Sequence, residues 1–180
     1  GDRVYEPASV SESYSKWQTI KATIDPSGDG KDETTLTIGA GLHSHVFLLK
    51  QAGWLEGHSE KTLKEIANLL VEYNVSSVRI EDNFGQGMFG QLLKPLLKKA
   101  WEEKDSQKPR PQGETRRGTE IVSERAPRHQ KEHRIIASLE TAMNSHRLVV
   151  AKEVLQEDFE TTQKRDGTDL RDRYSLMYQL

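Results

Sequence analysis

The chain has 180 residues, 34% of them hydrophobic and 30% charged, with a formal net charge of −2 and no cysteine. This length suits one domain with a proper core, and no apolar run approaches the roughly 20 residues that a membrane span needs. The lack of cysteine excludes disulfides and thiolate metal sites. Because the chain is not basic throughout, any contact with nucleic acid must come from a local patch.

The first third of the chain predicts three strands that pair as an antiparallel meander. A polar, extended lead-in covers residues 1–17. Runs of alternating or β-branched residues then place strands at about 18–25, 34–40 and 45–51. Glycine-rich and polar stretches separate these runs, as expected for turns.

The rest of the chain predicts helices that alternate with strands. Ser59 suits the N-cap of the first helix, Pro95 is expected to kink the second, and 105–118 is expected to be a mobile polar loop. The expected elements are a helix at 60–73, a strand at 75–81, a helix at 86–104, a strand at 119–124, a helix at 130–144, a strand at 147–150 and a helix at 153–162. Three strands followed by helix–strand units predict an α/β fold with a mixed sheet flanked by helices.

Two acidic residues end predicted strands. Asp25 is followed by Pro26 and a glycine-containing turn, and Glu81 ends the strand at 75–81. Magnesium and manganese prefer carboxylate oxygens, and two such ions can activate water and stabilise the leaving oxygen of a phosphodiester. The alternative is that Asp25 caps a turn and Glu81 is a solvated strand end.

Other catalytic motifs are missing from the sequence. The stretch 28–31 lacks the spacing of a nucleotide-binding phosphate loop, and Asp32 stands where that motif has Ser or Thr. No histidine pair has the acidic partner of zinc hydrolases, and there is no cysteine nucleophile or Gly-x-Ser-x-Gly elbow. We therefore expect neither a bound nucleotide cofactor nor zinc.

The most basic part of the chain lies at 108–134, where eight Lys and Arg residues stand against four glutamates. Within it, Arg125, Arg128 and Lys131 are predicted to contact DNA phosphates. An ordinary solvated surface would have a similar composition, and that alternative stays open.

Five blocks of sequence recur together in a known family, in the same order. They are Asp-Pro-Ser-Gly-x-Gly-Lys-Asp-Glu-Thr at 25–34, Glu-x-Asn-Phe-Gly-x-Gly-Met-Phe at 81–89, Gln-Lys-Glu-x-Arg-Ile-Ile at 130–136, His-Arg-Leu-Val-Val at 146–150 and Tyr-Ser-Leu-x-Tyr-Gln-Leu at 174–180. Together they resemble the C-terminal nuclease domain of the large terminase subunit of tailed bacteriophages. The resemblance spans roughly residues 20–180.

The resemblance implies a ribonuclease H-like α/β fold, with a mixed five-stranded sheet flanked by helices, over residues 18–180. In that family an Asp at the end of the first strand binds both metal ions, and an acid at the end of the fourth strand is the second ligand. Those positions are Asp25 and Glu81 here, which are therefore the expected catalytic residues. Asp32 lies in the same motif and is a further candidate ligand, acting through water. The implied cofactor is a pair of Mg²⁺ or Mn²⁺ ions.

The family implies a metal-dependent endonuclease that cuts concatemeric double-stranded viral DNA during genome packaging. Such a protein acts in the cytoplasm of the infected bacterium and is not a structural component of the virion. The implied partners are double-stranded DNA, the terminase ATPase domain, the small terminase subunit and the portal, with no membrane. The chain has no Walker motif and is not expected to hydrolyse ATP. The alternatives are a non-catalytic module that docks on DNA or the portal, and a resolvase-like nuclease of the same fold.

One departure from the family concerns its third acid, which lies in an acidic helix beyond the Tyr-Gln-Leu block. The given chain ends at Leu180, and the upstream acids Asp166, Asp169 and Asp172 do not match that position. We therefore expect the third acid to lie beyond Leu180. A version extended past Leu180 should then cleave well and the given chain poorly, and equal activity of the two would contradict this.

Overall fold

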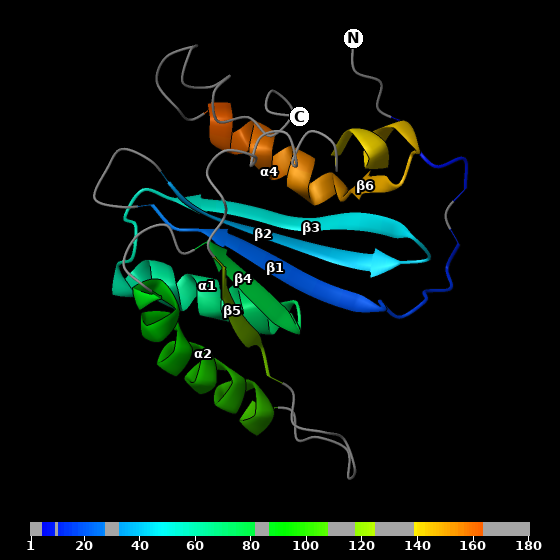
Figure 1. Cartoon of the computed structure of the whole chain (residues 1–180). Coiled ribbons are helices and arrows are strands. Elements are labelled where there is room, and N and C mark those ends of the chain that lie inside the picture. Colours follow the sequence, from blue (N-terminus) through cyan, green and yellow to red (C-terminus); the bar gives the residue numbers. More distant parts are fainter. Residues whose placement is uncertain are drawn as a thin grey trace.

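The computed structural model describes residues 5–9, 11–27, 33–81, 87–107, 118–124 and 139–163. Of residues 161–163 it describes the backbone only. These residues form one mixed sheet of six strands, in the order β5-β4-β1-β2-β3-β6, with helices packed against it (Figure 1). The elements in chain order are β1 (Thr19–Asp25), β2 (Thr34–Leu42), β3 (His45–Trp54), α1 (Glu60–Glu72), β4 (Ser77–Glu81), α2 (Met88–Gln107), β5 (Glu120–Glu124), β6 (Leu148–Val150) and α4 (Lys152–Gln163). None of the helices in these ranges is long and apolar enough to cross a membrane.

The first three strands form the predicted antiparallel meander. β1 pairs with β2 from Thr19 opposite Gly41 to Asp25 opposite Thr35. β2 pairs in turn with β3, with a shift of register between Ile38 and Gly39. Burial alternates along β1 and β2, because every second side chain points to the face that the helices cover.

The remaining strands run parallel to their neighbours. β4 is parallel to β1, β5 to β4, and β6 to β3. Because β2 is antiparallel to both β1 and β3, it alone runs the other way. The carboxyl ends of β1, β4 and β5 therefore meet at one side of the sheet, called here the carboxyl edge.

A single apolar core joins one face of the sheet to α1 and α2. The two helices lie together next to β1, β4 and β5, whereas α4 lies beside β3 at the other side of the sheet (Figure 1). The strands contribute Ala22, Ile24, Leu36, Ile38, Val78 and Ile80 to this core, and the helices contribute Leu63, Ile66, Ala67, Leu70, Val71, Phe89, Leu93, Leu97, Ala100 and Trp101. The opposite face of β1 and β4 carries polar side chains.

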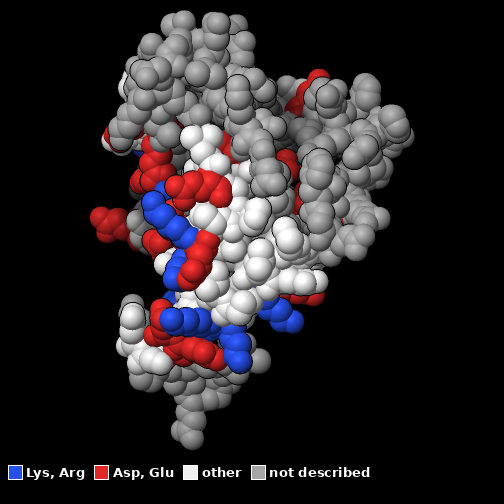
Figure 2. All heavy atoms as spheres, turned by 90° about the vertical axis from the view of Figure 1, so that its left-hand side faces the viewer, with Lys and Arg blue, Asp and Glu red and all other residues white. Residues whose placement is uncertain are grey.

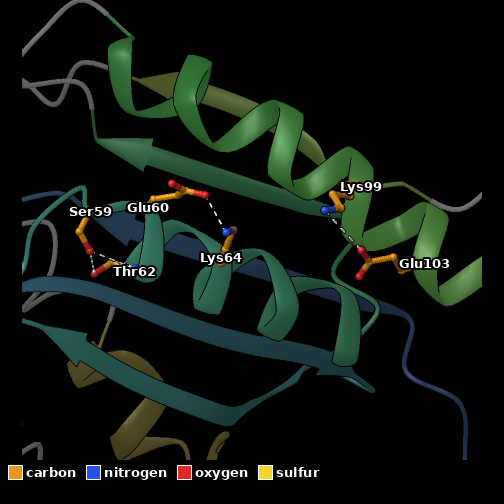
Figure 3. Close-up of polar contacts among 6 residues, drawn as sticks. All are labelled: Ser59, Glu60, Thr62, Lys64, Lys99 and Glu103. Carbon is orange, nitrogen blue, oxygen red and sulfur yellow. Dashed lines mark hydrogen bonds and ion pairs between the residues drawn. The ribbon is translucent and has the colours of Figure 1, made fainter.

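Helix α1 begins where its sequence predicts. The hydroxyl oxygen of Ser59 accepts a hydrogen bond from the backbone N–H of Thr62 (3.2 Å) and lies 3.0 Å from the Thr62 hydroxyl (Figure 3). One turn on, the Lys64 ammonium lies 2.6 Å from the Glu60 carboxylate, and this hydrogen bond lowers the pKa of Glu60. Ser59 thus supplies an acceptor for an N–H group that the helix itself leaves unpaired.

Helix α2 ends three residues later than the sequence predicts. It continues past Pro95 to Gln107, so the first residues of the expected loop at 105–118 are helical, while 108–117 lie outside the described residues. The Lys104 ammonium donates to the backbone carbonyl of Val71 (2.5 Å) and to the side-chain oxygen of Asn74 (3.0 Å). These contacts join α2 to the end of α1, and they could not be inferred from local composition.

The sheet has six strands rather than the five implied by the resemblance. Leu148–Val150 adds to the outer side of β3, where Val46 pairs with Leu148 and Leu48 with Val150. Of the helix predicted at 130–144, residues 139–144 are helical and the rest lie outside the described ranges. The other predicted elements are confirmed to within a few residues at their ends.

Replacing Ser59 with Ala should lower the free energy of unfolding by about 1 kcal/mol, because the Thr62 N–H loses its side-chain acceptor. Urea denaturation followed by circular dichroism measures this change. Ser106→Ala is the matched control, since the exposed Ser106 hydroxyl donates only to the Glu102 carbonyl near the end of α2. Equal stability of the two variants would show that the Ser59 cap contributes nothing.

Candidate active site

The parallel register brings Asp25 and Glu81 together at the carboxyl edge. The last paired residues of β1 and β4 are Ile24 and Ile80, and each acid comes one residue later as the last residue of its strand. Because side chains alternate along a strand, both acids lie on the face opposite the buried Ile24 and Ile80. Asp25 is exposed and Glu81 half-buried. The two acids singled out from the sequence are thus neighbours on one face of the sheet.

The turn after Asp25 is fixed at its base by a contact that the sequence analysis missed. The Ser27 N–H donates to the Thr34 hydroxyl oxygen (3.0 Å), and the hydroxyl groups of Ser27 and Thr34 lie 3.2 Å apart. Thr34 is fully buried, and the next residue, Thr35, pairs with Asp25. The contact therefore joins the described residues that follow β1 to the start of β2, directly next to the candidate metal ligand.

A third acid, Glu124, lies beside Glu81 at the same edge. The register of β4 and β5 places Glu81 opposite Glu124, so both side chains point to the same face. The Glu124 carboxylate forms an ion pair with Arg79, with 2.8 Å between Nε and Oε2. The sequence analysis missed Glu124, although the rule that singled out Asp25 and Glu81 applies to it, because the strand expected at 119–124 also ends in an acid.

A fourth carboxylate, that of Glu33, lies over β3. A Cβ atom on Gly53 would stand only 2.6 Å from Oε2 of Glu33, so the missing side chain makes room for this carboxylate. Gly53 pairs across the sheet with Thr35, and Thr35 pairs with Asp25. Glu33 therefore belongs to the acidic end of the sheet, two strands from Asp25.

A close approach also positions the start of α2 at the carboxyl edge. Gly90 is buried, and a Cβ atom there would lie 3.3 Å from Cγ2 of Ile121 and 3.6 Å from Cδ1 of Ile80. Gly87 has a φ of 83°, in the left-handed region that favours glycine. These two glycines let the helix begin directly against the ends of β4 and β5.

The donor chemistry of this edge fits magnesium or manganese. Carboxylate oxygens are the ligands that both ions prefer, and Asp25 and Glu81 present them from rigid strand ends. Within the ranges that the structure describes, no group of three or more His, Cys, Asp or Glu side chains is arranged to hold a metal ion. Asp32 and the basic candidates Arg125, Arg128 and Lys131 lie outside those ranges. The described part of the chain thus supplies two candidate ligands.

Among the described residues that Figure 2 shows, Lys and Arg side chains do not form a large continuous patch. The arrowheads of β1, β3 and β4 point to the left-hand side of Figure 1, and Figure 2 looks at the molecule from that side. Red and blue side chains alternate along one flank beside a white region, and undescribed residues are grey. Attraction of a phosphate backbone by the described residues in this view must therefore depend on individual cations.

An antiparallel meander joined to parallel β4 and β5 is a ribonuclease H-like arrangement, and solved structures share this fold. The large terminase of the thermophilic bacteriophage D6E superposes with a TM-score of 0.52 and 9% identity, over 85% of this chain and 33% of that one. The human cytomegalovirus terminase nuclease domain superposes with a TM-score of 0.51 and 10% identity, over 91% of this chain and 74% of that one. At these identities the comparison shows the fold.

Sequence comparison shows the family. The profile of the Bacteriophage T7 terminase ribonuclease H-like domain matches residues 24–148. The large terminase subunit of Enterobacteria phage T3 is 36% identical over 181 residues, which cover 100% of this chain and 28% of that protein. The chain therefore belongs to the ribonuclease H-like domain family of T7-type terminases. The resemblance inferred from the five sequence blocks is confirmed.

Replacing Thr34 with Val should lower the free energy of unfolding by about 1–2 kcal/mol, because the Ser27 N–H loses its acceptor next to Asp25. The variant should also bind Mn²⁺ several-fold more weakly, since Ser27 is no longer joined to Thr34 beside a candidate ligand. Urea denaturation and calorimetric titration measure the two effects. Thr37→Val, on the polar face of β2, is the matched control, and unchanged stability and Mn²⁺ affinity of Thr34→Val would contradict the expectation.

Proposed function

We propose that this domain is a metal-dependent endonuclease that cuts double-stranded viral DNA during genome packaging. The observation that carries the proposal is the pair of carboxylates, Asp25 and Glu81, side by side at the ends of β1 and β4. Family membership supports it, since the relatives include a phage terminase large subunit, and a viral terminase nuclease domain has a similar fold.

Asp25 and Glu81 would hold Mg²⁺ or Mn²⁺, and Asp32, which lies in the same sequence motif as Asp25, would assist through water. When bound, two such ions activate a water nucleophile and stabilise the leaving oxygen of a phosphodiester. The structure of the cytomegalovirus nuclease domain was determined after soaking with manganese, which supports a divalent ion in the family. The task of the protein itself is to keep the carboxylates on rigid, adjoining strand ends.

The DNA would reach the acids along the segment that follows β5. Arg125 comes directly after Glu124, the last residue of β5 at the carboxyl edge, and Arg128 and Lys131 follow closely in the sequence. Basic residues that follow a strand-end acid closely in the sequence would suit a phosphate backbone. We extend the proposal to the partners and place of action of the family: the terminase ATPase domain, the small subunit, the portal and the cytoplasm of the infected bacterium.

The non-catalytic module and the resolvase-like nuclease give different results in solution. A docking module binds DNA without metal-dependent cutting, even when the chain is extended past Leu180. A resolvase-like enzyme prefers branched DNA to a linear duplex of the same length. Metal-dependent cutting of linear duplex, with no preference for branches, supports the terminase nuclease.

Asp25→Asn and Glu81→Gln should each reduce the Mn²⁺-dependent cutting of supercoiled plasmid to the level of a chelator control, because each removes a carboxylate ligand. Conversion to nicked and linear DNA on agarose gels measures this, in the given chain and in one extended past Leu180. Glu72→Gln is the control, since exposed Glu72 ends α1, away from the carboxyl edge. Cutting that survives Asp25→Asn in the extended chain would exclude Asp25 from the active centre.

A further inference from the structure

We propose that Arg79 contacts a DNA phosphate at the carboxyl edge. In the absence of DNA, Glu124 holds the Arg79 guanidinium in place, and the phosphate then replaces the Glu124 carboxylate as its partner. The proposal deepens the proposed function and rests on it. Neither residue belongs to the set of candidate ligands and phosphate contacts inferred from the sequence. Arg79 is a positioning residue here, since it would place the DNA and not bind the metal.

The register places Arg79 next to the candidate metal ligands. It lies two residues before Glu81 on β4, so both side chains point to the same face, roughly 7 Å apart along the strand. Its lateral neighbours are Thr23 on β1 and Val122 on β5. A phosphate bound by Arg79 would therefore lie beside the carboxylates.

The ion pair with Glu124 is one that a phosphate can replace. The side chain of Arg79 is 64% exposed and that of Glu124 50% exposed, with 2.8 Å between Nε and Oε2. Exposed ion pairs contribute little to stability, because water screens them and holding two long side chains costs entropy. A guanidinium binds a phosphate through two parallel N–H bonds, which a point charge such as an ammonium cannot reproduce.

The charges of the edge show why this cation matters. Asp25, Glu81 and Glu124 stand at three adjoining strand ends on one face and repel a phosphate backbone. Among the described residues of β1, β4 and β5 on this face, the cations are Arg79 and Lys21, and Lys21 lies four residues before Asp25. Arg79 is the nearer of the two to the acids. Its charge offsets that of Glu124 in the free protein and becomes available to DNA when the pair opens.

The test measures DNA binding separately from cutting. Anisotropy of a short labelled duplex, in chelator and at several salt concentrations, should show several-fold weaker binding by Arg79→Gln. The slope of log affinity against log salt should fall by about one unit, as expected for one lost phosphate contact. Arg79→Lys should retain part of the affinity. Arg147→Gln is the matched control, because exposed Arg147 directly precedes β6, at the opposite end of the sheet.

Glu124→Gln tests the holding role. It should tighten DNA binding, and by a larger factor in the parent than in an Arg79→Gln background, since the two residues act as a pair. Circular dichroism confirms that each variant is folded. Calorimetric titration with Mn²⁺ should show unchanged metal affinity for Glu124→Gln. Loss of that affinity would make Glu124 a metal ligand and overturn its role as the partner of Arg79.

The outcomes separate this inference from the proposed function. If the parent cuts DNA in an Asp25-dependent way while Arg79→Gln binds DNA with the parent's affinity and salt slope, the role of Arg79 is refuted and the nuclease stands. If the parent neither binds nor cuts DNA, even when extended past Leu180, the proposed function falls and the role of Arg79 falls with it.

Discussion

The parallel pairing of β1 with β4 is the constraint on which the candidate site depends. In the sequence, β2, β3 and α1 lie between these two strands. The pairing places Asp25 and Glu81 at adjoining strand ends. The apolar face beneath fixes the register, because Ile24 and Ile80 are both buried against the helices. A slip of one residue would turn every side chain of the strand to the other face, which would bury the acid and expose the core. Core packing and site geometry are therefore specified by the same residues.

The arrangement of α1 and α2 separates the acidic face of β1 and β4 from the apolar core. α1 and α2 both cover the apolar face of β1 and β4, so the polar side chains of these strands remain on the other side. Gly90 lets α2 begin against the strand ends, and Gly53 leaves room for the carboxylate of Glu33. In both places the lack of a side chain allows a close approach: of α2 to the strand ends at Gly90, and of the Glu33 carboxylate to β3 at Gly53. The edge is thus shaped by the packing around it as well as by the acids themselves.

Local patterns in the sequence predicted most of the strands and helices and both acids, because alternation, capping and strand-end position are properties of short segments. Ser59 was identified as an N-cap in this way, and Asp25 and Glu81 as strand-end acids. What the sequence did not reveal depends on contacts between distant segments. The contacts of Lys104 with the end of α1 join two helices that no local pattern brings together, and the pairing of the predicted strand at 147–150 with β3 depends in the same way on a distant segment. Glu81 and Glu124 are neighbours because of the register between β4 and β5, and no local pattern of the sequence determines that register.

An acidic edge of this kind has an electrostatic cost that the structure reduces in two ways. The carboxylates of Asp25 and Glu124 stay in contact with water, where charge repulsion is weak, and Arg79 neutralises Glu124 directly. A divalent ion held by Asp25 and Glu81 would remove the remaining repulsion between them. Because such an ion binds the folded sheet and not the separated strands, it would also stabilise the fold in proportion to its occupancy. The parallel pairing that brings the two acids together would then be strengthened by the ion that we propose they hold.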